Sequence, residues 1–193
     1  MQMIDLREQA RRLGTLPKEL DNLADEVDRV RAGEISLPVR EIAPLAVWAG
    51  GLSIRCLLFL DILADSQYAV MKDGAEALAD MAETCVQVNT ASCLCSDAIT
   101  GRTDALIYKD ADETAETARA RLGEASTELR AAADRYRGFT RTLTLRLASS
   151  VTRAEDRRLI EAALTGRAKA QGKAGAVPSP AVAPEQTAAR RSR

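Results

Sequence analysis

The sequence predicts an all-α fold: an antiparallel helical hairpin or bundle with coiled-coil-like packing, followed by a disordered C-terminal tail. Aromatic residues make up only 3% of the 193 residues, so the core has to be built from Ala, Leu, Val and Ile. Alanine and leucine are strong helix formers. Two stretches also repeat their apolar residues at helical spacing, which predicts helices that bury one face.

The first helical pattern covers residues 3–32 and has the spacing of a coiled-coil seam. Apolar residues recur every seven positions, at Leu6, Leu13, Leu20 and Val27. The positions three residues later complete the seam: Gln9, Leu16, Leu23 and Val30. All but Gln9 are apolar. Gly14 and Pro17 interrupt the pattern, with Thr15 between them as a helix N-cap. We therefore expect a short helix, a kink and a longer helix that ends at Gly33.

Residues 34–51 are expected to form a connector that ends in a tight turn. Pro38 and Pro44 disfavour one long helix, because proline lacks an amide hydrogen and clashes with the preceding turn. The sequence Trp-Ala-Gly-Gly at 48–51 is typical of a turn, since paired glycines adopt conformations that strain other residues.

A long apolar stripe then advances in steps of three and four residues. Its eleven positions are Leu63, Gln67, Val70, Gly74, Leu78, Met81, Cys85, Val88, Ser92, Cys95 and Ile99. Eight of them are apolar, which predicts a helix with one buried face. Gly74 is a point where this helix weakens or breaks, and Gly101 is its expected end.

Further helices are expected between Gly101 and the tail. Residues 103–122 form one that ends near Gly123, and residues 124–137 form the next. Residues 139–148 fit a strand or a helix, and the helical context favours the helix. A capping box at 152–155 opens a last helix to about Leu164. From residue 166 onward almost no large apolar side chain occurs, which predicts disorder.

Charge is distributed unevenly, although the net charge is only −1. Residues 1–120 carry 12 Lys/Arg and 21 Asp/Glu, whereas residues 121–193 carry 15 and 7. The sequence therefore predicts three parts: an acidic helical bundle at 1–122, a basic helical extension at 123–165 and a disordered Ala/Pro/Arg tail at 166–193.

Seven arginines define the basic arm of the chain. They are Arg135, Arg137, Arg141, Arg146, Arg153, Arg157 and Arg158. One interpretation is that this arm docks on the acidic part within the same molecule or dimer. The other is that it binds nucleic acid or an anionic membrane surface. Tyr136 and Phe139 lie between the arginines, as in some single-strand nucleic-acid binders, but a helix would also bury them.

Neither catalysis nor a bound cofactor or metal is expected. The chain has no histidine, the commonest general base and metal ligand. It contains no phosphate-binding or nucleophile-elbow motif. A zinc site would need all four thiolates, from Cys56, Cys85, Cys93 and Cys95, and their spacing is not that of a zinc site. Cys85 and Cys95 fall on the apolar stripe, where cysteine acts as a small core residue.

Two short motifs carry a resemblance to a known family. Trp48 and Gly50 form a W-x-G, and Tyr108 and Asp112 form a Y-x-x-x-D. This combination resembles the WXG-type family of actinobacterial type VII secretion substrates, and the context of Tyr108 resembles the EspC-like members. The resemblance covers residues 1–122. It implies a helical hairpin with Trp48 and Gly50 in its turn. It also implies an export signal in which Tyr108 and Asp112 share one helix face.

The resemblance implies a non-enzymatic type VII secretion substrate or secretion-associated protein. It would pair helices with itself or with a small helical partner, and it would meet a secretion ATPase. No apolar signal-peptide segment is visible, so we expect secretion or cell-envelope association by a signal-peptide-independent route, with the cytoplasm as the alternative.

Two other functions stay open. The first is a cytoplasmic helical adaptor whose basic arm binds nucleic acid or an acidic partner. The second is a membrane-associated helical protein that uses residues 42–64, a stretch long and apolar enough to cross a bilayer. Arg55 and Asp61 each disfavour insertion, so a fully buried core helix is the preferred interpretation of this stretch.

Overall fold

The computed structural model describes residues 1–108 and 115–174, and within these ranges it contains helices and no strand. The helices are α1 (Leu6–Leu13), α2 (Leu16–Ala32), α3 (Pro38–Ala64), the short 3-10 helix η1 (Gln67–Val70), α4 (Gly74–Ile107), α5 (Ala115–Ala148) and α6 (Ser150–Ala174). The predicted all-α fold is confirmed.

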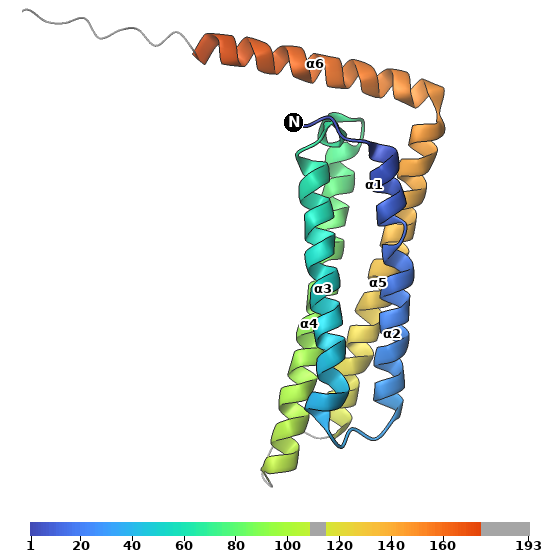
Figure 1. Ribbon diagram of the computed structural model, residues 1–193, viewed down its shortest axis with the longest axis vertical. Coiled ribbons are helices and arrows are strands. Elements are labelled where there is room, and N and C mark those ends of the chain that lie inside the picture. Colours follow the sequence, from blue (N-terminus) through green and yellow to red (C-terminus); the bar gives the residue numbers. More distant parts are fainter. Residues whose placement is uncertain (109–114, 175–193) are drawn as a thin grey trace, which may run out of the picture.

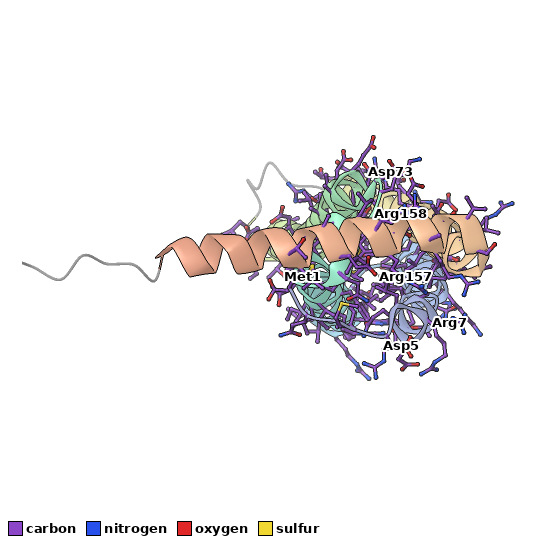
Figure 2. The ribbon with its side chains drawn as sticks, turned by 90° about the horizontal axis from the view of Figure 1, so that it is seen from above. Met1, Asp5, Arg7, Asp73, Arg157 and Arg158 are labelled. Carbon is purple, nitrogen blue, oxygen red and sulfur yellow. The ribbon has the colours of Figure 1, made fainter. Side chains whose placement is uncertain are left out.

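An antiparallel four-helix bundle forms the body of the molecule. The chain runs down through α1 and α2, up through α3, down through α4 and up through α5 (Figure 1). α2 packs against α3 and α5, and α4 packs against the same two helices from the other side. α6 then crosses the end of the bundle and extends beyond it (Figure 2). Each of the four long helices is therefore one corner of the bundle.

The predicted seam along α1 and α2 lies in the core. Its leucines and valine at 13, 16, 20, 23 and 27 are completely buried. The predicted kink is present: α1 ends at Leu13, and α2 begins at Leu16 with Pro17 in its first turn. α2 ends at Ala32, with Gly33 as the C-cap, as expected.

Small residues fill much of the core between α4 and α5. The buried alanines there are Ala91, Ala98, Ala118, Ala125, Ala132 and Ala133. The expected stripe is also buried at Met81, Cys85, Val88 and Cys95. Small side chains let two helix backbones approach closely, which explains how a chain with so few aromatic residues packs a long bundle.

The helices break where backbone geometry requires it, near Gly74. The long predicted helix is divided between two helices, because α3 ends at Ala64 and α4 begins at Gly74. A Cβ atom on Gly74 would lie 2.1 Å from the carbonyl oxygen of Tyr68, so no other residue fits there without movement. Asp73 precedes it with a left-handed φ of 57°. The predicted break at Gly74 is thus confirmed.

Within α3, α4 and α5, by contrast, the glycines and prolines expected to end helices do not do so. α3 begins at Pro38 and runs through Pro44, α4 runs past Gly101 to Ile107, and α5 runs through Gly123. One glycine costs only about 1 kcal/mol in a helix, which tertiary packing readily offsets. At Gly123 the missing side chain also makes room for the Arg31 guanidinium, whose Nη1 would lie 2.8 Å from a Cβ atom.

The predicted division of the chain changes accordingly. The boundary between 122 and 123 falls inside α5, whose whole length is the fourth helix of the bundle and not an extension. Residues 139–148 are helical, as preferred. Ser149, rather than Thr152, caps α6: its Oγ accepts from the Thr152 amide at 3.3 Å. α6 continues past Leu164 to Ala174. The remaining tail, 175–193, lies outside the described residues.

Candidate interaction surface on α3

One face of α3 exposes a row of large apolar side chains. The exposed fraction is 75% for Val47, 62% for Ile54, 52% for Leu57 and 57% for Leu58. The predicted fully buried core helix is therefore wrong for this stretch. The opposite face is buried, at Ile42, Leu45, Ala49, Leu52 and Cys56. α3 is thus apolar on both faces, and only one of them has a partner in this fold.

Contacts on both flanks fix the direction of this exposed face. Towards α4, the Ser92 hydroxyl donates to the Ala46 carbonyl at 3.2 Å. Towards α2, Arg55 forms an ion pair with Glu19, and its Nη2 donates to Glu19 Oε1 at 3.1 Å. The hydrogen bond from Arg55 lowers the pKa of Glu19. The face between these two flanks points away from the bundle.

Eight exposed positions on this face follow the spacing of a coiled-coil seam. They are Arg40, Pro44, Val47, Gly51, Ile54, Leu58, Asp61 and Asp65. We call this set the α3 seam. Its steps alternate between four and three residues throughout, as the a and d positions of a heptad do. The apolar part lies in the middle, with one arginine at one end and two aspartates at the other.

The length and composition of α3 also meet the requirements for a membrane span. The helix has 27 residues, and its most apolar window has a mean hydropathy of 1.7. Only 28% of that window is buried in the fold. Length and hydropathy alone do not distinguish a membrane-spanning helix from a helix that pairs with another protein helix. The arrangement of charged and apolar residues along the seam does.

Trp48 and Gly50 lie inside α3 and not in a turn, so the predicted turn is wrong. The helix continues through both glycines because its inward face is anchored by Ala49 and Leu52, which are buried. Gly50 instead allows close contact with α4: a Cβ atom there would lie 3.5 Å from Ser92 Oγ. Trp48 is 37% exposed and flanks the α3 seam on the side of Arg55.

Tyr108 is far from Trp48 along the bundle. It follows the last residue of α4 with an extended backbone, φ −109° and ψ 124°, and is 62% exposed. The expected helix does not include Tyr108, and Asp112 lies outside the described residues. Trp48 is level with Ser92 of α4. Tyr108 lies sixteen residues beyond Ser92, or about 24 Å at 1.5 Å per helical residue. Tyr108 therefore does not lie beside Trp48.

Three of the seven arginines of the basic arm, and Arg130 before them on α5, pair with acidic residues of the same molecule. Arg130, Arg135, Arg137 and Arg146 all form ion pairs. Arg130 reaches Asp25 and Asp28 of α2 at 2.9 Å, and Arg135 reaches Glu83 of α4 at 2.6 Å. Arg137 pairs with Asp21 of α2. These contacts support the first interpretation of the charge asymmetry, docking within the molecule.

The other arginines of the basic arm face solvent. Arg141, Arg153, Arg157 and Arg158 are exposed, and the described residues offer them no ion pair. Arg153 donates only to the Ser149 carbonyl, at 3.2 Å. Arg157 and Arg158 lie on α6 across the end of the bundle, Arg157 on the side of Arg7 and Arg158 on the side of Asp73 in the view of Figure 2. Tyr136 is buried and Phe139 packs edge-on against Tyr68, with ring centroids 5.9 Å apart. These aromatic rings therefore belong to the core.

A buried polar cluster joins α3, α4 and α5 around Tyr136. Its hydroxyl lies 3.7 Å from the Cys85 sulfur, and burial together with the nearby Cys56 thiol raises the pKa of Tyr136. Burial raises the pKa of Cys56 and of Cys95 to about 11, and it raises the pKa of Cys85 and Tyr136 as well. Thiols held protonated in this way are weak nucleophiles. Among the described residues, no group of three or more Asp, Glu or Cys is placed to hold a metal ion.

Several hollows lie at the surface of the described part of the molecule. A groove of about 530 Å³ between α4 and α5 contains the Arg135–Glu83 ion pair and the Phe139 ring. A second, of about 400 Å³, lies under α6 and is lined by Leu6, Leu147 and Ile160. In the first, the Glu83 carboxylate is held by Arg135. The largest unexplained feature of the molecule is the α3 seam.

The fold and this seam define a four-helix bundle with an additional exposed apolar face on α3. The chain matches no protein-family model, and no curated protein or solved structure is significantly similar to it. The seam itself was not predicted from the sequence, although its four-three spacing is visible there once residues 42–64 are not assigned wholly to the core.

Proposed function

We propose that this chain is a non-enzymatic interaction protein that pairs its α3 seam with a helix of another protein molecule. The observation that supports this proposal is the row formed by Val47, Ile54 and Leu58, whose side chains are all more than half exposed. Single exposed apolar residues are common on protein surfaces. A continuous row on one helix is not, and it marks a surface that is covered in the working state.

A helical partner fits this surface better than a lipid bilayer. Helices that lie in the membrane interface carry Lys and Arg along their polar face. The α3 seam instead has Arg40 at one end and the carboxylates of Asp61 and Asp65 at the other. Insertion of α3 across a bilayer would also remove its buried face from the core and break the Arg55–Glu19 pair. The four-three spacing of the seam is that of helix pairing.

Site-specific photo-crosslinking in the source cells tests this proposal. A benzophenone amino acid replaces Ile54 on the seam, and the control places it at Thr127, an exposed residue of α5. We expect a discrete protein adduct from position 54 and none from position 127. Crosslinking to lipid alone, or equal adducts from both positions, would contradict pairing through the seam.

Secretion by a type VII system is a second proposal, supported by the exposed position of Tyr108 at the end of α4. A residue that is 62% exposed on extended backbone can enter a receptor groove without unfolding the bundle. The test is an immunoblot of culture filtrate and cells from a host with a working type VII system. The wild type should reach the filtrate and Tyr108→Ala should stay in the cells. Retention of the wild type alongside an exported control substrate would exclude the proposal.

The adaptor alternative has less support. Four arginines of α5 are paired with carboxylates of the same molecule, so that helix does not offer a continuous basic surface to nucleic acid. The exposed arginines of α6 remain available to an acidic partner.

A further inference from the structure

We propose that the partner on the α3 seam is a second copy of this chain, bound antiparallel with α3 against α3 in a two-fold symmetric dimer. This inference rests on the proposed function and specifies its partner. It follows from a symmetry within the seam. When two copies of the seam run in opposite directions, basic residues lie opposite acidic ones and apolar residues lie opposite apolar ones. A two-fold interface uses the same surface on both subunits, so the surface has to complement itself in this way.

The charges at the two ends of the seam define the direction. Arg40 lies twelve to thirteen residues before the midpoint of the seam, and Asp65 lies equally far after it. In an antiparallel pair, Arg40 of each copy therefore lies opposite Asp65 of the other, with Asp61 one turn away. A parallel pair would place arginine beside arginine and aspartate beside aspartate, which is unfavourable. Arg40 and Asp61 have no ion pair with any described residue of their own chain, so both are free to form one.

The apolar residues complete the interface in the same register. Val47 of each copy lies opposite Leu58 of the other, and Gly51 lies opposite Ile54, as a and d positions do in antiparallel coiled coils. Gly51 has no atom within 4 Å of the position of a Cβ atom. The large Ile54 side chain of the second copy has space there. Pairing thus covers the side chains that the monomer leaves exposed at the centre of α3.

Charge exchange between the two ends of the seam provides the test. Sedimentation velocity is measured for the full chain, for Arg40→Glu, for the double variant Asp61→Lys/Asp65→Lys, and for their equimolar mixture. Arg141→Glu is the matched control, because Arg141 is an exposed arginine of α5 without an ion pair among the described residues. The new charges agree with the helix dipole, acidic near the start of α3 and basic near its end, so the fold should be retained. Circular dichroism verifies this.

We expect the wild type and Arg141→Glu to form dimers, and each seam variant to dissociate at least about ten-fold more readily. The mixture should recover the dimer, because every interface in the mixed pair again joins opposite charges. A monomeric wild type, or seam variants that dimerise like the wild type, would overturn self-pairing. The crosslink from position 54 separates the two proposals. An adduct with a different protein would leave the proposed function intact, whereas the absence of any protein adduct would remove both.

Discussion

The guanidinium of Arg146 and the carboxylate of Asp156 form a two-point ion pair across the corner between α5 and α6. Arg146 Nε lies 2.9 Å from Asp156 Oδ2, and Nη2 lies 2.5 Å from Oδ1. The side chains are 12% and 7% exposed. Asp156 also accepts from the Lys72 amide at 3.3 Å. One buried carboxylate therefore connects α6 to α5 and to the turn before α4.

Asp156→Asn should release α6 while the bundle stays folded. The substitution leaves the buried Arg146 charge with only the Asp73 carboxylate, at 3.9 Å, as a counter-charge, and breaking a buried pair typically costs about 3–5 kcal/mol. α6 packs on one end of the bundle, against α5 and η1, so it can detach at lower cost than global unfolding. Amide hydrogen exchange should become faster in residues 150–166 and change little in α2 and α4.

The control for this prediction is Glu161→Gln, an exposed residue on the same helix without an ion pair among the described residues. It should leave hydrogen exchange in α6 as in the wild type. If Asp156→Asn instead lowers protection throughout the bundle, the corner is part of the global folding unit and α6 is not an independently docked helix.

One thiol of the four should react in the native protein. Cys93 is exposed, whereas Cys56, Cys85 and Cys95 are buried, and burial raises the pKa of these three. Only thiolate attacks a thiol reagent at a useful rate. At pH 8 a chromogenic disulfide reagent should therefore modify one cysteine per chain quickly, and four after denaturation. Rapid modification of two or more native thiols would contradict the buried positions.

The stability of the bundle should fall in the alkaline range, in part because of Cys95. Burial raises its pKa from 9.0 to about 11, so between these values the unfolded chain has lost the proton that the folded chain keeps. Between these two pKa values, each such group lowers the free energy of unfolding by about 1 kcal/mol for each unit that the pH rises. Below pH 8 it does not change the free energy of unfolding. Urea unfolding of Cys95→Ala between pH 8 and 10.5 should give a smaller slope than the wild type. Cys93→Ala should keep the wild-type slope.

The sequence was sufficient to predict which helices bury their faces. The seven-residue repeat from Leu6 to Val27 and the stripe from Met81 to Cys95 depend only on side-chain periodicity, and both lie in the core. The kink near Gly14 and the break at Gly74 were also predicted. These features follow from local chemistry that any all-helical packing has to satisfy.

The connections and the candidate surface were harder to predict, because they depend on packing. Gly50, Gly101 and Gly123 look like helix ends in isolation, yet each lies in a helix anchored along its length by buried neighbours. The α3 seam was missed for a related reason. A helix that is apolar on two faces gives no clear periodicity, so the sequence alone does not reveal that one of those faces has no partner within the chain.

Two glycines should respond oppositely to alanine. Gly74→Ala places a methyl group 2.1 Å from the Tyr68 carbonyl oxygen, and overpacking of this kind costs about 1–3 kcal/mol. Gly138 lies within α5 with no atom within 4 Å of its Cβ position, so Gly138→Ala should stabilise the fold by about 0.5–1 kcal/mol. Thermal unfolding compares the two directly. Equal effects would mean that the turn at Gly74 relaxes easily.

The exposed arginines on α6, rather than those of α5, should govern binding to polyanions. Arg157 and Arg158 have no ion pair among the described residues, whereas Arg130 and Arg137 are neutralised locally by carboxylates of α2. A polyanion gains more from an unpaired charge, because it does not compete with a neighbouring aspartate. On a heparin column, Arg157→Ser/Arg158→Ser should elute at lower salt than the wild type. The control, Arg130→Ser/Arg137→Ser, carries the same net charge change and should shift less. Equal shifts would show that only net charge matters and that α6 presents no distinct basic surface.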